Sequence, residues 1–211
     1  MDSTSTPYSQ NTDAVYWKNG QQVVLAKNAD VTGIVVSDSD VYVSGGSTNG
    51  VGAVYWKNGK MVTLAQNAYV PYATGIAVSG NDVYASGFLT NPNGTGYSTA
   101  AIYWKNGKMV TLAQNAYVPY ATGIAVSGND VYVSGSINAD TAVYWKNGQQ
   151  IMLSNNNSVY TSYATSIAVS GNDVYVAGYL QNSNVFGSSV PVYWKNGKMV
   201  MLAPGNSIYY K

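Results

Sequence analysis

The sequence predicts an all-β chain built from repeated four-stranded units, and three observations support this prediction. The phrase Tyr-Trp-Lys-Asn-Gly occurs five times, beginning at Tyr16, Tyr55, Tyr103, Tyr144 and Tyr193. A second phrase, Ile-Ala-Val-Ser-Gly-Asn-Asp-Val-Tyr, occurs three times intact and once in altered form. β-Branched and aromatic residues recur at every second position, and no segment has a helical period. Copies of the first phrase are 39, 48, 41 and 49 residues apart, which is the range in which one repeat forms a four-stranded propeller blade.

Each phrase predicts a β-hairpin. In the first phrase, Asn-Gly stands between two β-prone arms, and both residues tolerate the positive φ that a type I′ turn requires. In the second phrase, the first arm is small and apolar on both sides, as expected for a strand that is covered on both faces. We call the arms of the second hairpin strands a and b, and those of the Tyr-Trp-Lys-Asn-Gly hairpin strands c and d. Each unit therefore has four antiparallel strands in the order a, b, c, d.

This order predicts a single β-propeller domain over residues 1–211, with one hairpin left over at its N-terminal end. The four complete blades span approximately residues 34–64, 76–112, 124–153 and 167–202. We predict that residues 207–211 supply strand a and residues 6–9 supply strand b of a fifth blade, which comprises 207–211 plus 6–25 and is closed by both chain termini. Two alternatives stay open: four blades plus a stray N-terminal hairpin, and a ring that another chain completes.

The composition narrows the possible functions. The chain contains no Cys, His, Arg or Glu, and its formal net charge is +1. Without arginine or a basic cluster, nucleic acid is not an expected partner, and no apolar run is long enough for insertion into a membrane as a helix. Histidine-based triads, histidine zinc sites and cysteine nucleophiles are impossible because the chain has no His or Cys. Asp30 and Asp140 stand outside the turns, but no constellation surrounds them. We expect no enzyme activity, no cofactor and no metal site.

The repeats also support a family resemblance. Residues Tyr55 to Tyr84 are identical to residues Tyr103 to Tyr132. From Ala14 to Leu202, the array resembles β-propeller repeats with Tyr-Trp-Lys-Asn-Gly and Ser-Gly-Asn-Asp-Val-Tyr-Val hairpins, which occur in poorly characterised bacterial exported or surface proteins. In outline it is also similar to five-bladed propeller lectins of the tachylectin type, whose sequence signature it lacks. The resemblance implies an extracellular or cell-surface location and supplies no catalytic residues.

The candidate ligand-binding residues lie in the connections from strand d to the next strand a. Tyrosine offers a flat apolar face and a hydroxyl, and asparagine offers paired donors and acceptors, which together suit a sugar. The candidates are Asn67, Tyr69, Tyr72, Asn115, Tyr117, Tyr120, Tyr160 and Tyr163. Equivalent sites repeated around a ring would bind a multivalent surface with avidity. In the alternative interpretation, these tyrosines pack between blades.

Other repeated residues favour structural roles. The tryptophan of each copy is expected to fill the wedge between blades. Asp40, Asp82, Asp130 and Asp173 recur at the a–b turn, where a turn role bonding their own backbone is favoured over a ring of carboxylates around a cation. The expected function is a non-enzymatic, lectin-like binding module for a glycan or a surface protein. The alternative is a structural or protein–protein interaction propeller in a larger surface protein, without a small-molecule ligand.

Overall fold

The computed structural model describes residues 12–47, 52–65, 70–90, 98–114, 117–138, 140–153, 160–182 and 189–202. Every regular element in these ranges is a β-strand. The N-terminal hairpin consists of β1 (Asp13–Lys18) and β2 (Gln21–Lys27). Sheet I consists of β3 (Ala29–Ser37), β4 (Asp40–Ser47), β5 (Gly52–Lys57) and β6 (Lys60–Thr63).

Three further sheets repeat the plan of sheet I. Sheet II consists of β7 (Val70–Ser79), β8 (Asp82–Thr90), β9 (Ser98–Lys105) and β10 (Lys108–Gln114). Sheet III consists of β11 (Tyr120–Ser127), β12 (Asp130–Ile137), β13 (Thr141–Lys146) and β14 (Gln149–Met152). Sheet IV consists of β15 (Tyr160–Ser170), β16 (Asp173–Asn182), β17 (Ser189–Lys195) and β18 (Lys198–Met201). All strand pairs are antiparallel between sequence neighbours, which confirms the predicted all-β class and the four-stranded unit.

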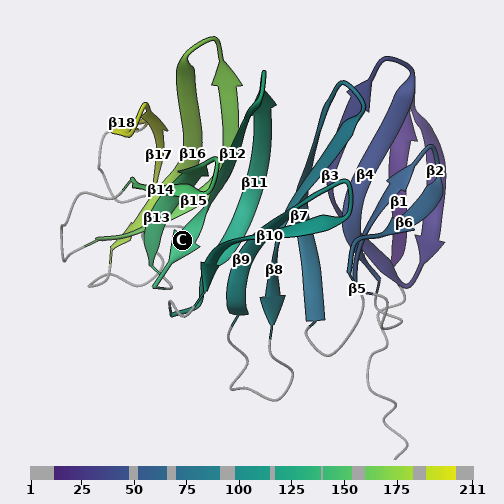
Figure 1. Cartoon of the computed structure of the whole chain (residues 1–211), viewed down its shortest axis with the longest axis horizontal. Helices are drawn as coiled ribbons and strands as arrows, with labels where there is room; N and C mark the ends of the chain where they lie inside the picture. Colours follow the sequence, from purple (N-terminus) through teal and green to yellow (C-terminus); the bar gives the residue numbers. More distant parts are fainter. Residues whose placement is uncertain are drawn as a thin grey trace, which may run out of the picture.

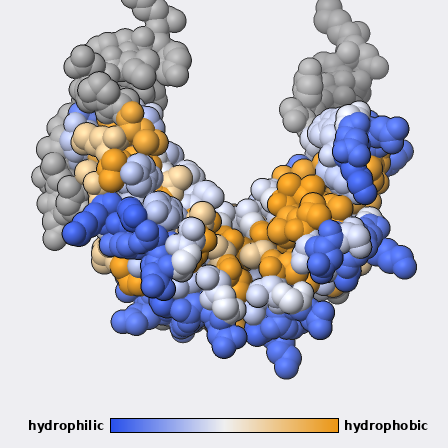
Figure 2. All heavy atoms as spheres, turned by 90° about the horizontal axis from the view of Figure 1, so that it is seen from above, coloured by the Kyte–Doolittle hydropathy of each residue, from blue (hydrophilic) through white to orange (hydrophobic). Residues whose placement is uncertain are grey.

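The sheets stand side by side in sequence order (Figure 1). Seen from above, the molecule has the outline of a U, with the N-terminal hairpin and sheet IV in opposite arms (Figure 2). Among the described residues, no strand of the N-terminal hairpin pairs with a strand of sheet IV, so the arc is open. Residues 6–9 and 207–211, which the sequence assigns to the closing strands, lie outside the described ranges.

The tight c–d turns have the expected backbone geometry. Asn58 has φ 50° and Gly59 has φ 80°, and the other Asn-Gly pairs are alike. Both central residues of a type I′ turn need positive φ, which glycine adopts without strain and asparagine tolerates better than most residues. The local sequence therefore determines the hairpins.

Strand a begins earlier in each sheet than the sequence pattern indicates. Sheet II starts at Val70 instead of Ile76, and sheet III starts at Tyr120 instead of Ile124. The additional residues pair with the end of strand b, as Tyr72 does with Phe88. Parts of the predicted d-to-a loops are therefore strand.

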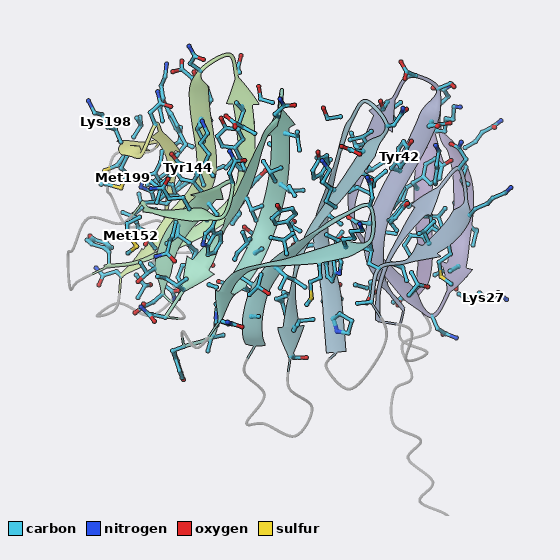
Figure 3. All side chains as sticks on the ribbon, in the orientation of Figure 1. Lys27, Tyr42, Tyr144, Met152, Lys198 and Met199 are labelled. Carbon is cyan, nitrogen blue, oxygen red and sulfur yellow. The ribbon has the colours of Figure 1, made fainter. Side chains whose placement is uncertain are left out.

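The core lies between neighbouring sheets, and an equivalent cluster of buried side chains recurs at each junction. Trp104 of sheet II packs with Ala53 and Leu64 of sheet I, and Trp194 of sheet IV packs with Ala142 and Leu153 of sheet III. The tryptophans of sheets I to IV thus face the preceding unit and fill the wedge, as predicted. For Trp17 of the N-terminal hairpin the prediction is wrong, because this side chain is 64% exposed and no described unit precedes it. Tyr42 and Tyr144 lie within the array, whereas Lys27 and Lys198 lie towards its two ends (Figure 3).

A β-bulge in strand a adds a second link between sheets. The pairing register skips one threonine in each sheet: Thr32, Thr74, Thr122 or Thr165. A bulge re-aims the extra side chain, and the first three threonines use it to donate to the next sheet. Their acceptors are the carbonyl oxygens of Ala73, Ala121 and Ala164, at 2.9–3.0 Å. Thr165 bonds Ala177 of its own sheet instead.

Candidate functional site

The candidate site is a row of side chains at one register position of strand a. Sheets I to IV carry Asp30, Tyr72, Tyr120 and Tyr163 at this position, each two residues before the bulged threonine. The residues paired with them on strand b are Gly46, Phe88, Ser136 and Tyr179. All lie at the end of the strands from which the long connections leave, opposite the a–b turns at the top of Figure 1. The repeat therefore places three tyrosines on one rim.

Sheets III and IV together form the densest part of the row. The rings of Tyr163 and Tyr179 stack with their centroids 4.9 Å apart and their planes 22° apart. Burial raises the pKa of the Tyr179 hydroxyl, and the nearby phenols of Tyr120 and Tyr163 raise it further. Tyr120 of sheet III thus lies close enough to influence the pair in sheet IV. All three side chains are half-buried, so part of each remains accessible.

Tyr72 forms a second aromatic contact, within sheet II. Its ring stacks on Phe88 with centroids 5.7 Å apart. The ring also leans over sheet I, because a Cβ added to Gly46 would lie 3.0 Å from it. Burial raises the pKa of the Tyr72 hydroxyl, with a smaller contribution from the carboxylate of Asp30. Tyr72 therefore both covers the junction and presents an edge at the rim.

A strained connection holds one tyrosine outwards. Tyr117 is 56% exposed, and Pro119 two residues later is fully buried. Between them, Val118 has φ 48°, which is rare for a β-branched residue because its Cβ crowds the following carbonyl oxygen. Such strain persists where the surroundings impose it and is often found at binding sites. The buried proline anchors this connection at the start of β11.

The structure brings together some of the predicted site residues and places others apart. Tyr72, Tyr120 and Tyr163 are strand residues of the row, not loop residues, because strand a starts early. Tyr160 begins β15 and is 38% exposed. Asn67, Tyr69 and Asn115 lie outside the described residues.

Sequence reasoning missed the strand b partners in the row. Phe88 and Tyr179 follow the repeated hairpin phrase and are not among the candidates, but both lie in strands and stack on the tyrosine opposite. Their common position, four residues after the Tyr-Ala-Ser-Gly or Tyr-Val-Ala-Gly sequence starts, is the signal that could have found them. Cross-strand aromatic pairs stabilise a sheet, so these rings have a structural role as well.

The opposite rim carries a four-residue cluster in each complete sheet. In sheet I, Lys57 Nζ lies 2.8 Å from Asp40 Oδ2, and Asn58 Nδ2 donates to Asp40 Oδ1 at 2.7 Å. Asn58 Oδ1 accepts from the backbone N of Val41, and Lys57 lies over the Tyr42 ring, 5.1 Å from its centroid. Lys57 and then Asn58 lower the pKa of the Asp40 carboxyl, and Asp40 raises the pKa of Lys57.

This cluster corrects the expected role of the turn aspartates. Gly80, at φ 57°, makes the a–b turn of sheet II, so Asp82 becomes the first residue of β8. From there its carboxylate meets Lys105 and Asn106 at the c–d turn instead of its own backbone. The aspartates therefore join the two hairpins of one sheet. Within the described ranges, no three His, Cys, Asp or Glu side chains are grouped as metal ligands.

Two results complete this picture. The described part of the chain contains no helix with the length and apolar character needed to cross a membrane. Comparisons with models of known protein families and with curated proteins give no significant match.

Proposed function

We propose that the protein is a non-enzymatic binding module that recognises carbohydrate at the tyrosine row. The observation that carries this proposal is the repetition of half-buried tyrosines at one register position in three successive sheets, Tyr72, Tyr120 and Tyr163. A sugar ring packs its apolar face against an aromatic ring and bonds through its hydroxyls to phenol groups. The stacked pair of Tyr163 and Tyr179, with Tyr120 nearby, offers an aromatic surface of three rings on this rim.

The rigidity of the row supports this proposal. Each tyrosine is fixed by strand pairing on a packed sheet, so little side-chain freedom is lost on binding. Tyr117, on its strained connection, extends the surface outwards next to Tyr120. A shallow site of this kind binds one sugar weakly, and repetition of the site gives avidity on a multivalent glycan. The absence of histidine, glutamate and cysteine from the sequence supports a role without catalysis.

A glycan array followed by titration calorimetry tests this proposal. We expect Tyr117→Ala combined with Tyr120→Ala to weaken binding of the best glycan by about tenfold or more, because stacked aromatic anchors dominate such contacts. Val200→Ala, an exposed change in β18 of sheet IV, should leave affinity unchanged. Absence of any glycan binding at millimolar concentration, or unchanged affinity in the double variant, would refute the proposal.

A second candidate function is a structural or interaction propeller in a larger surface protein. The exposed apolar residues at both ends of the arc favour it. Leu202 of sheet IV is 63% exposed, whereas the equivalent Leu153 of sheet III is 3% exposed because sheet IV packs over it. If the tyrosines serve only packing, Tyr120→Ala should reduce stability strongly and no glycan should bind.

The four sheets support the further proposal that the units are blades of a β-propeller. Completion of a fifth blade by residues 207–211 and 6–9 stays a prediction. We propose an extracellular or cell-surface location, with a glycan or a surface protein as partner and no role for nucleic acid or membrane insertion.

A further inference from the structure

The N-terminal end of the arc contains an apolar groove between the N-terminal hairpin and sheet I. Its volume is about 410 Å³. The residues that line it come from β1, β3 and β4: Val15, Tyr16, Trp17, Val31, Thr32, Gly33, Ile34 and Val43. Figure 2 shows hydrophobic residues on the inner side of this arm of the U. We call this groove the hairpin slot.

Residues that are buried elsewhere in the repeat are exposed in the hairpin slot. Trp17 is 64% exposed, whereas its equivalent Trp56 is 1% exposed. Ile34 is 55% exposed, whereas its equivalent Ile76 is 9% exposed against sheet I. Trp17 belongs to the N-terminal hairpin, and no described unit stands in front of it. Ile34 faces the preceding unit, this hairpin, which within the described residues consists only of strands c and d. The slot lies where strands a and b of that unit would lie.

The backbone of β1 also has an unused edge in the described part of the chain. In sheets I to IV, strand c pairs with strand b on one side and with strand d on the other. β1 pairs with β2 alone. A row of unpaired amide and carbonyl groups is a template for an added strand. The edge therefore favours an extended partner over a compact one.

The turn of the N-terminal hairpin carries half of the repeated polar cluster. Lys18 and Asn19 are the equivalents of Lys57 and Asn58, and Asn19 has the same positive φ, 51° against 50°. In every complete sheet, this lysine and asparagine bind the aspartate that begins strand b, at 2.7–2.8 Å. No aspartate takes that place beside Lys18 within the described ranges. A partner with a carboxylate at this point would be complementary in charge.

We infer that the hairpin slot binds an inner β-hairpin of the repeat type, supplied by a different polypeptide, not a second copy of this chain, that carries the same Ser-Gly-Asn-Asp-Val-Tyr sequence. Its first strand would cover Ile34, its second strand would pair with β1, and its aspartate would meet Lys18 and Asn19. Trp17 lies at the open end and would stay uncovered by this hairpin. A complete unit stacked beyond it could cover Trp17, in the same way that the N-terminal hairpin covers Trp56. Residues 1–11 and 203–211, which would close a fifth blade in the competing prediction, contain no Asp-Val-Tyr sequence. The inference does not depend on glycan binding, which uses the tyrosine row.

A synthetic peptide with the sequence of residues 120–137, which spans β11 and β12, tests the inference. The peptide contains no tryptophan, so it adds no tryptophan signal of its own. Binding by the full chain is measured by calorimetry, and the chain's Tyr16 and Ile34 amide signals are followed by NMR. We expect saturable one-to-one binding with shifts confined to the strands that line the slot, β1, β3 and β4. The peptide with Asp130→Asn should bind the wild-type chain about three- to tenfold more weakly.

A matched variant isolates the charge contact. In Lys18→Ala, the wild-type and Asp130→Asn peptides should bind with similar affinity, because the ion pair is already lost. Lys60→Ala, an exposed lysine of sheet I, should retain the full difference between the peptides. Equal binding of the two peptides by the wild-type chain would overturn the inference.

A fused chain provides a second test, because an isolated hairpin is marginally stable and the free peptide can fail to bind simply by not folding. Residues 120–137 are placed ahead of Met1, so that residues 1–11 form the connection to β1. We expect a higher melting temperature than for the wild-type chain, and protection of β1 amides from hydrogen exchange. No stabilisation by the fusion, together with no peptide binding, would overturn the inference. Protection of the β1 amides in the peptide-free monomer would also overturn it, because the chain's own termini would then cover the edge. Protection only in a dimer would overturn it as well, because a second copy of this chain would then be the occupant.

Discussion

The hydroxyl of Thr74 lies 2.9 Å from the carbonyl oxygen of Ala121 and ties sheet II to sheet III. The same hydroxyl lies 3.0 Å from Ser86 Oγ, so one bulged residue bonds two strands in different sheets. Thr165, at the end of the arc, has no following sheet in the described residues and bonds Ala177 within sheet IV. The bulge therefore provides a link between sheets only where another sheet follows.

Thr74→Val should lower the free energy of unfolding by about 1 kcal/mol, because valine keeps the shape but leaves the Ala121 carbonyl and the buried Ser86 hydroxyl with one partner fewer. Thr165→Val, at an exposed position, should cost less than about 0.5 kcal/mol. Urea unfolding of both variants measures the difference. Equal costs at the two positions would contradict a role for the link between sheets.

Trp104→Ala should destabilise the protein by about 3–5 kcal/mol, because it empties the wedge between sheets I and II. Trp17→Ala removes a side chain that is 64% exposed, and surface changes of this kind usually cost about 0.5 kcal/mol or less. The buried Trp104 Nε1 has no acceptor among the described residues, so Trp104→Phe loses packing but no hydrogen bond and should cost less than alanine. Denaturant unfolding gives the order of the three variants.

Gly87→Ala should destabilise sheet II, because the added Cβ would overlap the backbone oxygen of Tyr72 and lie 2.7 Å from the Trp104 ring. Overpacking of this kind costs about 1–3 kcal/mol. Gly33→Ala provides the comparison, since its Cβ would meet only Ser44 Oγ at 3.0 Å and atoms beyond 3.4 Å. Thermal unfolding should show the larger loss for Gly87→Ala, and the opposite order would contradict this packing.

Stability should fall in acid through the four turn aspartates. Their lysine and asparagine partners hold the pKa of Asp40, Asp82, Asp130 and Asp173 below the ordinary value of 3.8. A carboxyl whose pKa is lowered by folding stabilises the native state above its unfolded pKa, and this contribution is lost as pH falls through the folded pKa. The melting temperature should therefore drop below about pH 4. The variant with all four residues changed to asparagine should lose most of this acid dependence.

Much of the architecture follows from the sequence alone, because it depends on neighbours along the chain. The Asn-Gly turns at Asn58 and Gly59 require only local φ values, and the two-residue period of the strands needs no tertiary partner. The repeated tryptophan could be assigned to the core because a large apolar ring recurring in every unit has few other roles. The candidate tyrosines could be named because they recur between strand d and the next strand a and carry both a flat ring and a hydroxyl. Their location within strands could not be predicted.

Tertiary structure decided what depends on the neighbouring sheet. Trp17 and Trp56 occupy identical phrases, yet one is exposed and the other buried, because burial depends on whether a complete unit lies beside the ring. The partner of Asp82 is Lys105, 23 residues later, since the turn glycine moves the carboxylate into the strand. The stacking of Tyr163 on Tyr179 and the link from Thr74 to Ala121 likewise arise from strand register and from a bulge. Local sequence does not specify these, because they bring together atoms that are distant along the chain.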